Sequence, residues 1–128
     1  MSLVSIYAGG ILTLLMALFH TRFYKIFNWE IEYSRISKTN KKIFYTIHLA
    51  LLILFILIGV LSLIYAPELS RCRGIAFGIN VMLAVFWFWR ALWQVFYFKG
   101  KILHYVLIAA FLILGITYLI PVVLKLSQ

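Results

Sequence analysis

Residues 75–98, IAFGINVMLAVFWFWRALWQVFYF, decide the fold of this protein. The stretch is long enough to cross a bilayer as a helix, since about 20 apolar residues span a hydrocarbon core of roughly 30 Å. It nevertheless carries Asn80, Arg90 and Gln94, whose polar groups lipid cannot hydrogen-bond. We therefore interpret it as a membrane helix with a polar stripe that faces other protein segments.

The composition of the whole chain agrees with a membrane protein. Its 128 residues are 66% hydrophobic, and the mean hydropathy is +1.07. A soluble domain of this size cannot bury so much apolar surface. The net charge of +9 suggests a nucleic-acid partner at first, but the basic residues lie almost wholly between the apolar segments. That distribution follows the positive-inside rule, and we expect no nucleic-acid partner.

Four apolar segments recur along the chain, at about residues 3–20, 43–65, 74–98 and 102–124. One connection of medium length, residues 22–42, and two short ones join them. Short connections place successive helices antiparallel. The sequence therefore predicts an all-α fold: a single transmembrane domain over residues 1–128, with four helices in an up-down-up-down bundle.

The basic residues also predict an orientation. The first and third connections together carry eight Lys or Arg, whereas the opposite side carries only Arg71, Arg73 and Lys125. Lysine and arginine are retained on the cytoplasmic side, so both termini should lie on the non-cytoplasmic side. No basic residue precedes the first segment and no small-x-small cleavage site follows it, so we expect a membrane anchor there and not a signal peptide.

Local patterns make further predictions about the helices. In the 22–42 connection, Trp29, Tyr33 and Ile36 are spaced as on one face of a helix, and the connection either extends the first helix or forms a short amphipathic helix. Candidate caps for the second span are Ser37, Thr39 and Asn40. Two sets of small residues, Ser5/Gly9/Thr13 and Gly74/Gly78, predict close helix contacts. Pro121 predicts a kink or fraying near the end of the last helix.

The polar residues of the third span fall on one side of it. A helix advances about 100° per residue, which gathers six residues into a sector of about 100°: Asn80, Leu83, Trp87, Arg90, Gln94 and Tyr97. Polar groups at membrane depth usually face the bundle interior or a wet cavity. We expect either a ligand site or, alternatively, a snorkelling Arg90 with hydrogen bonds between helices.

Three histidines should lie at a similar depth. His20 ends the first span, His48 lies inside the second, and His104 begins the fourth, all on the predicted cytoplasmic side. Three chemistries would use such a cluster: an anion site with Arg90, a three-histidine zinc, copper or iron site, and a bis-histidine haem in which His48 is the best axial candidate. No carboxylate lies in any span, which argues against a di-iron carboxylate centre or a carboxylate proton relay.

Signatures of catalysis are missing from the sequence. There is no HExxH, GxSxG, P-loop or GxGxxG motif. Cys72 is the only cysteine, so one chain forms neither an internal disulfide nor an iron–sulfur set. These features favour a binding protein over an enzyme without excluding an enzyme.

A series of motifs runs through about residues 38–98: Asn40-Lys41 with Phe44 and His48, Pro67 at the end of the second span, and then FWFWRALWQVFYF. In this series the chain resembles a group of small bacterial four-helix membrane proteins of unknown activity. In that group an Arg-x-x-x-Gln pair followed by aromatics ends the third helix, here Arg90 and Gln94. An acidic residue then follows, where this chain has Lys99. The resemblance implies a bacterial inner membrane and brings no activity with it.

The sequence thus leads to one functional hypothesis and two alternatives. The first is binding of an anionic or amphipathic small molecule, or of a lipid head group, by Arg90, Gln94, His48, Trp87 and Asn80. The second is a redox subunit that holds haem b or a divalent metal through His48, His20 and His104. The third is an accessory subunit that forms a homo-oligomer, or joins a membrane partner, through its small-residue faces.

Overall fold

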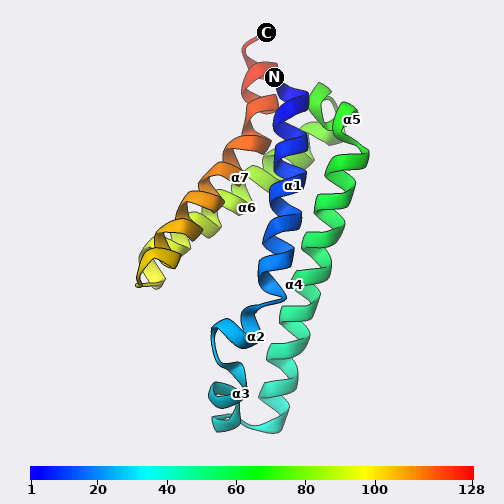
Figure 1. Ribbon diagram of the computed structural model, residues 1–128. Coiled ribbons are helices and arrows are strands. Elements are labelled where there is room, and N and C mark those ends of the chain that lie inside the picture. Colours follow the sequence, from blue (N-terminus) through cyan, green and yellow to red (C-terminus); the bar gives the residue numbers. More distant parts are fainter.

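A computed structural model describes residues 1–128, and all of its regular structure is helical (Figure 1). Four long helices, α1 (Ser2–His20), α4 (Lys38–Ile64), α6 (Ile75–Tyr97) and α7 (Ile102–Leu126), are long and apolar enough to cross a membrane. This confirms the predicted number of long apolar helices. Helix α4 starts five residues before the predicted span because the Ser37 hydroxyl caps it, accepting a hydrogen bond from the Asn40 backbone N–H at 3.2 Å.

The first connection is not one continuous helix. It divides into three short pieces, α2 (Phe23–Ile26), α3 (Trp29–Glu32) and the 3₁₀ turn η1 (Tyr33–Arg35). Asn28 separates the first two, since its φ of 50° is left-handed and ends the helical path. The expected i, i+4 neighbours Trp29 and Tyr33 still stack, with ring centroids 4.9 Å apart. The helical spacing was therefore a correct guide to one contact but not to the whole segment.

Helix α1 occupies the centre of the molecule. It packs against α4, α7 and the short helix α5 (Ala66–Arg71), while α6 packs mainly against α7. Both termini and α5 lie at one end, which we call the terminal end; the 22–37 connection lies at the opposite, connection end (Figure 1). The α6–α7 pair diverges from the α1–α4 pair toward the connection end, and α4 and α6 make little backbone contact. This divergence opens the space in which the candidate site lies.

Small residues bring α1 close to its neighbours, as predicted. A Cβ added to Gly9 would lie 2.8 Å from Thr117 Oγ1 and 3.0 Å from the Tyr118 ring. On the other side of α1, Gly10 and Gly59 each place the backbone oxygen 3.2 Å from the other's added Cβ. The Ser5/Gly9/Thr13 face is buried inside the chain. It therefore serves internal packing and is not free to bind a partner subunit.

The second small-residue pair does not form a contact within the chain. Nothing lies within 4 Å of a Cβ added to Gly74 or Gly78. Gly74 instead has a φ of +54° just before α6, a backbone conformation that glycine adopts at low cost. The predicted helix contact at Gly74/Gly78 is therefore wrong for the single chain, because the pair lies on an open side of α6.

The last helix passes through its proline. Pro121 lies inside α7, is buried, and is followed by helix as far as Leu126. The ring removes the hydrogen bond to the Thr117 carbonyl, but two flanking turns hold the helical path. Fraying at this point, one of the two outcomes expected from the sequence, is therefore not seen.

A buried tyrosine links three of the four long helices. The Tyr118 hydroxyl on α7 lies 2.8 Å from Ser62 Oγ on α4 and 3.4 Å from Thr13 Oγ1 on α1. Hydrogen bonds between membrane helices contribute about 1 kcal/mol each. We expect Tyr118→Phe to lower the free energy of unfolding by about 1 kcal/mol in detergent, measured by thermal or denaturant unfolding. Tyr105→Phe, at an exposed site on the same helix, is the control; equal effects of both changes would contradict the role of this network.

Candidate anion-binding site

The polar stripe of α6 faces the interior over most of its length. Asn80, Leu83, Trp87 and Gln94 are buried, and Arg90 is half-buried. Tyr97 departs from the stripe: it is the last residue of α6 and is 68% exposed. The helical periodicity of the sequence therefore located the inward face correctly up to its last turn.

Arg90 is held between two aromatic rings. Its Cζ lies 4.6 Å from the centroid of the Phe111 ring and 5.5 Å from that of Phe98. Its Nη1 donates a hydrogen bond to Gln94 Oε1 at 3.1 Å. The long apolar spans contain no carboxylate that would neutralise the guanidinium. Arg90 therefore keeps its charge and most of its N–H donors free for an acceptor outside the protein.

Gln94 joins Arg90 to the last helix. Because a guanidinium only donates, the Gln94 oxygen faces Arg90 and its amide nitrogen faces His104, 3.2 Å from Nδ1. The Gln94 N–H therefore donates to His104 Nδ1, which must carry a lone pair in this arrangement. The chain of donors runs from Arg90 through Gln94 to His104, and it fixes the position of the guanidinium relative to α7.

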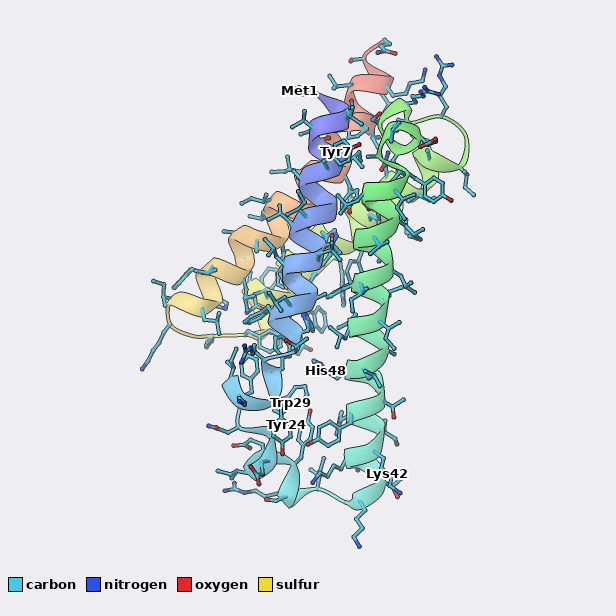
Figure 2. The ribbon with its side chains drawn as sticks, turned by 45° about the vertical axis from the view of Figure 1, so that its right-hand side comes forward. Met1, Tyr7, Tyr24, Trp29, Lys42 and His48 are labelled. Atoms are coloured by element: carbon cyan, nitrogen blue, oxygen red, sulfur yellow. The ribbon has the colours of Figure 1, made fainter.

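His20 and His48 form a second cluster on the other side of the site. The His20 Nδ1–H donates to the Met16 carbonyl at 2.9 Å, and the His48 Nε2–H donates to the His20 carbonyl at 3.0 Å. The two imidazoles stack with centroids 5.7 Å apart. The ring centroids of Phe23 and His20 lie 4.2 Å apart in a stacked pair, and those of Trp29 and His48 lie 4.7 Å apart in a T-shaped pair. Figure 2 labels Trp29 on the first connection and His48 on α4. Each imidazole keeps one nitrogen that no protein group uses.

The structure brings together most, but not all, of the residues that the sequence predicted to form the site. His20 and His48 are adjacent, whereas His104 is engaged with Gln94. No group of three or more His, Cys, Asp or Glu residues is arranged to hold a metal ion. Asn80 lies apart from the site: its Nδ2 donates to the Leu69 carbonyl at 2.8 Å and fixes the turn between α5 and α6.

Two cavities meet at Arg90. The polar cavity, so named for its charged side chains although most of its lining surface is apolar, has a volume of about 590 Å³ and lies between the first connection and the α6–α7 turn. The aromatic cavity has a volume of about 320 Å³ and lies where α4 and α6 diverge. Arg90 and Phe98 line both cavities. The guanidinium therefore lies between the two cavities, of which only the polar cavity also contains Lys99 and Lys101.

Positive charge dominates the polar cavity. Arg90, Lys99 and Lys101 line it together with a single carboxylate, that of Glu32. Tyr33 contributes a phenol whose pKa is raised by burial and, to a smaller extent, by the nearby Tyr45, so this group is a neutral hydrogen-bonding partner at pH 7. The cavity therefore offers an anion two flexible ammonium groups, one fixed guanidinium and a phenol.

Aromatic side chains form most of the second cavity. It is lined by His20, Leu51, Phe55, Phe86, Trp87, Trp89, Arg90, Trp93, Phe98 and Phe111. Trp87 is fully buried, and its indole N–H has no acceptor in the protein. A buried donor without an acceptor costs about 1–3 kcal/mol. The N–H is closed off from the cavity, since no part of Trp87 is exposed.

Sequence reasoning missed several residues of the site. Phe23, Trp29, Lys99 and Lys101 line or cover it, although none was nominated. One signal was present: the connection from residue 22 to 42 is too rich in aromatic residues for a free polar loop. The placement of Phe23 and Trp29 nevertheless depends on the connection folding back beneath α1, and that of Lys99 and Lys101 on the turn between α6 and α7; no local pattern specifies either.

Comparison with known proteins assigns no relative to this chain. No protein-family model matches it, and neither the curated proteins nor the solved structures yield a match. The function is therefore argued from the site itself. Its defining features are a guanidinium without a carboxylate partner, two lysines at a polar cavity, and an aromatic cavity directly beside them.

Proposed function

We propose that the four long helices cross the bacterial inner membrane in an up-down-up-down arrangement, with the connection end in the cytoplasm and both termini outside. The distribution of basic residues supports this orientation, since eight Lys or Arg lie in the first and third connections and three on the opposite side. The outward faces of α4 and α6 are apolar and exposed, as lipid-facing surfaces are. Arg90 then lies in the cytoplasmic half of the bilayer.

We further propose that the protein binds an amphipathic anion at Arg90. The observation that carries this proposal is that the Arg90 guanidinium lines both the polar cavity, with its two lysines, and the aromatic cavity. An anionic head group would lie in the polar cavity beside Lys99 and Lys101, and an apolar chain or ring would lie in the aromatic cavity. Cavities of about 300–1,000 Å³ are typical of small-molecule sites, and both cavities fall in this range.

Electrostatics favour the anion over other ligands. Hydrogen bonds between a guanidinium and an oxyanion are about twice as strong as neutral ones, and they strengthen where the surroundings are apolar. Binding an anion also offsets the cost of holding an uncompensated guanidinium away from bulk water. A cationic amphiphile would meet three positive side chains and one carboxylate, so the same site should reject it.

Ligand binding explains the side chains of this site better than catalysis does. The site holds a fixed cation, a neutral amide and histidines whose N–H groups contact backbone carbonyls or whose lone pair accepts from Gln94. No nucleophile adjacent to a base is present among them. Each polar group is instead placed to donate to an oxygen or to position a group that does. We therefore propose a binding role for the site and no reaction.

A titration with matched amphiphiles tests the proposal. The purified protein, in a neutral detergent, is titrated with dodecyl phosphate, dodecyltrimethylammonium and inorganic phosphate while tryptophan fluorescence is recorded. Trp29 lines the polar cavity and the other three tryptophans line the aromatic cavity, so the fluorescence signal reports on the site. We expect saturable binding of dodecyl phosphate, with both other compounds at least about tenfold weaker, a difference of about 1.4 kcal/mol. Equal responses to the anionic and cationic amphiphiles would overturn the proposal.

A further inference from the structure

The opposite end of the molecule also gathers positive charge. Arg71, Arg73 and Lys125 are the only basic residues of the terminal end outside the spans, and all three line one pocket. The pocket has a volume of about 400 Å³, and Ser2, Ser70 and Gln128 are its other polar lining residues. We call it the terminal basic pocket. It shares no residue with the two cavities at Arg90.

The fold brings these cations together from distant parts of the sequence. Arg71 is in the last turn of α5, Arg73 is in the turn that leads to α6, and Lys125 is in the last turn of α7. The negative ends of α5 and α7 each favour one nearby cation. That effect does not account for Arg73, which belongs to neither helix, or for the contact that sets α5 against α7.

No carboxylate side chain balances the charge of this pocket. Its lining contains no Asp or Glu, and Glu68, the one acidic residue of this end, lines a different cavity between α4 and α6. Like charges brought to one place repel each other unless an anion lies between them. Helices of a membrane protein end at the depth of the lipid head groups, where phosphate is the abundant anion.

We propose that the terminal basic pocket binds a phosphate group. Two guanidinium forks match phosphate oxygens in pairs, and the Lys125 ammonium adds a point charge. The Ser70 hydroxyl already donates to the Pro67 carbonyl at 2.8 Å, so the three cations carry the recognition. Pro121 and Leu124 supply an apolar side to the pocket, on which the glycerol and first acyl carbons of a lipid would rest. The phosphate belongs either to a lipid head group or to free phosphate, and this chemistry is common to both.

The test compares two triple variants of the full chain. R71Q/R73Q/K125Q removes the three cations of the pocket, and R22Q/R35Q/K38Q removes two arginines and one lysine that are exposed at the other end and line neither cavity. Both variants lose the same net charge. Each protein is reconstituted in phosphatidylcholine nanodiscs that contain roughly 10% phosphatidylglycerol as the anionic lipid. After release from the nanodiscs, the lipid that stays bound is counted by native mass spectrometry.

With Arg90 replaced by alanine, we expect the chain alone and the chain with R22Q/R35Q/K38Q to retain one phosphatidylglycerol each. R71Q/R73Q/K125Q should lower that retention at least about tenfold, or 1.4 kcal/mol. Addition of inorganic phosphate distinguishes the sources: displacement of the lipid at millimolar phosphate identifies free phosphate as the ligand, and no displacement identifies the head group. R71K/R73K keeps the charge but loses the guanidinium forks, so its lipid retention should lie between that of the unchanged pocket and that of R71Q/R73Q/K125Q. Equal retention by both triple variants would overturn the proposal. All counts are taken in the Arg90→Ala background, which removes the proposed amphiphile site and leaves the terminal basic pocket intact.

Discussion

Arg90→Ala is expected to weaken the binding of dodecyl phosphate by about 100-fold while the helices remain folded. Each hydrogen bond to a charged group contributes about 1.5–3 kcal/mol, so two bonds from the guanidinium to one phosphate correspond to roughly 3 kcal/mol or more. Lys99 and Lys101 are exposed, and water screens their charges. They should therefore recover little of the loss. Fluorescence titration gives the affinity, and circular dichroism gives the helix content.

Three further variants show whether the charge or its placement matters. Arg90→Lys keeps the charge but not the planar fork, and should lose about tenfold. Gln94→Leu keeps the volume but removes the acceptor that orients Arg90, and should lose severalfold, with the preference for anions retained. Arg22→Ala removes one exposed charge from the same end of the molecule and should have almost no effect. If Arg22→Ala weakened binding as much as Arg90→Ala, net charge and not the site would govern binding.

Gly9→Leu is expected to have the largest effect on stability. The added Cβ alone would lie 2.8 Å from Thr117 Oγ1 and 3.0 Å from the Tyr118 ring, so a leucine side chain must push α7 away from α1. Overpacking costs about 1–3 kcal/mol in well-packed cores. Separation of the two helices would also break the Tyr118 contacts with Thr13 and Ser62. We therefore expect a total loss near 3 kcal/mol or more, with aggregation at moderate temperature.

Gly78→Leu provides the matched control for this prediction. It makes the same substitution in a long helix, but nothing lies within 4 Å of its added Cβ. Its unfolding midpoint, measured in the same detergent, should equal or slightly exceed that of the wild type, since leucine favours a helix more than glycine does. A loss at Gly78 as large as that at Gly9 would mean that the open side of α6 is covered by another copy of the chain. Cross-linking would then reveal an oligomer.

Periodicity and charge alone predicted much of this protein. The number of membrane spans follows from the length of the apolar segments, and the inward face of α6 follows from the spacing of Asn80, Trp87 and Gln94. The cap at Ser37 and the close packing at Gly9 were also predicted. These features depend on interactions between residues a few positions apart, or on whether a helix face contacts lipid or protein. Local sequence patterns predict features of both kinds.

Only the tertiary structure decided how the helices diverge and what lies in the space between them. The pairing of His20 with His48, the engagement of His104 by Gln94, and the approach of Lys99 and Lys101 to Arg90 all join residues from different helices. So does the meeting of Arg71 and Arg73 with Lys125 at the other end. In lipid every helix satisfies its own backbone hydrogen bonds, so packing between side chains sets the angles between helices. Such packing depends on all four helices together, and no single stretch of the sequence specifies it.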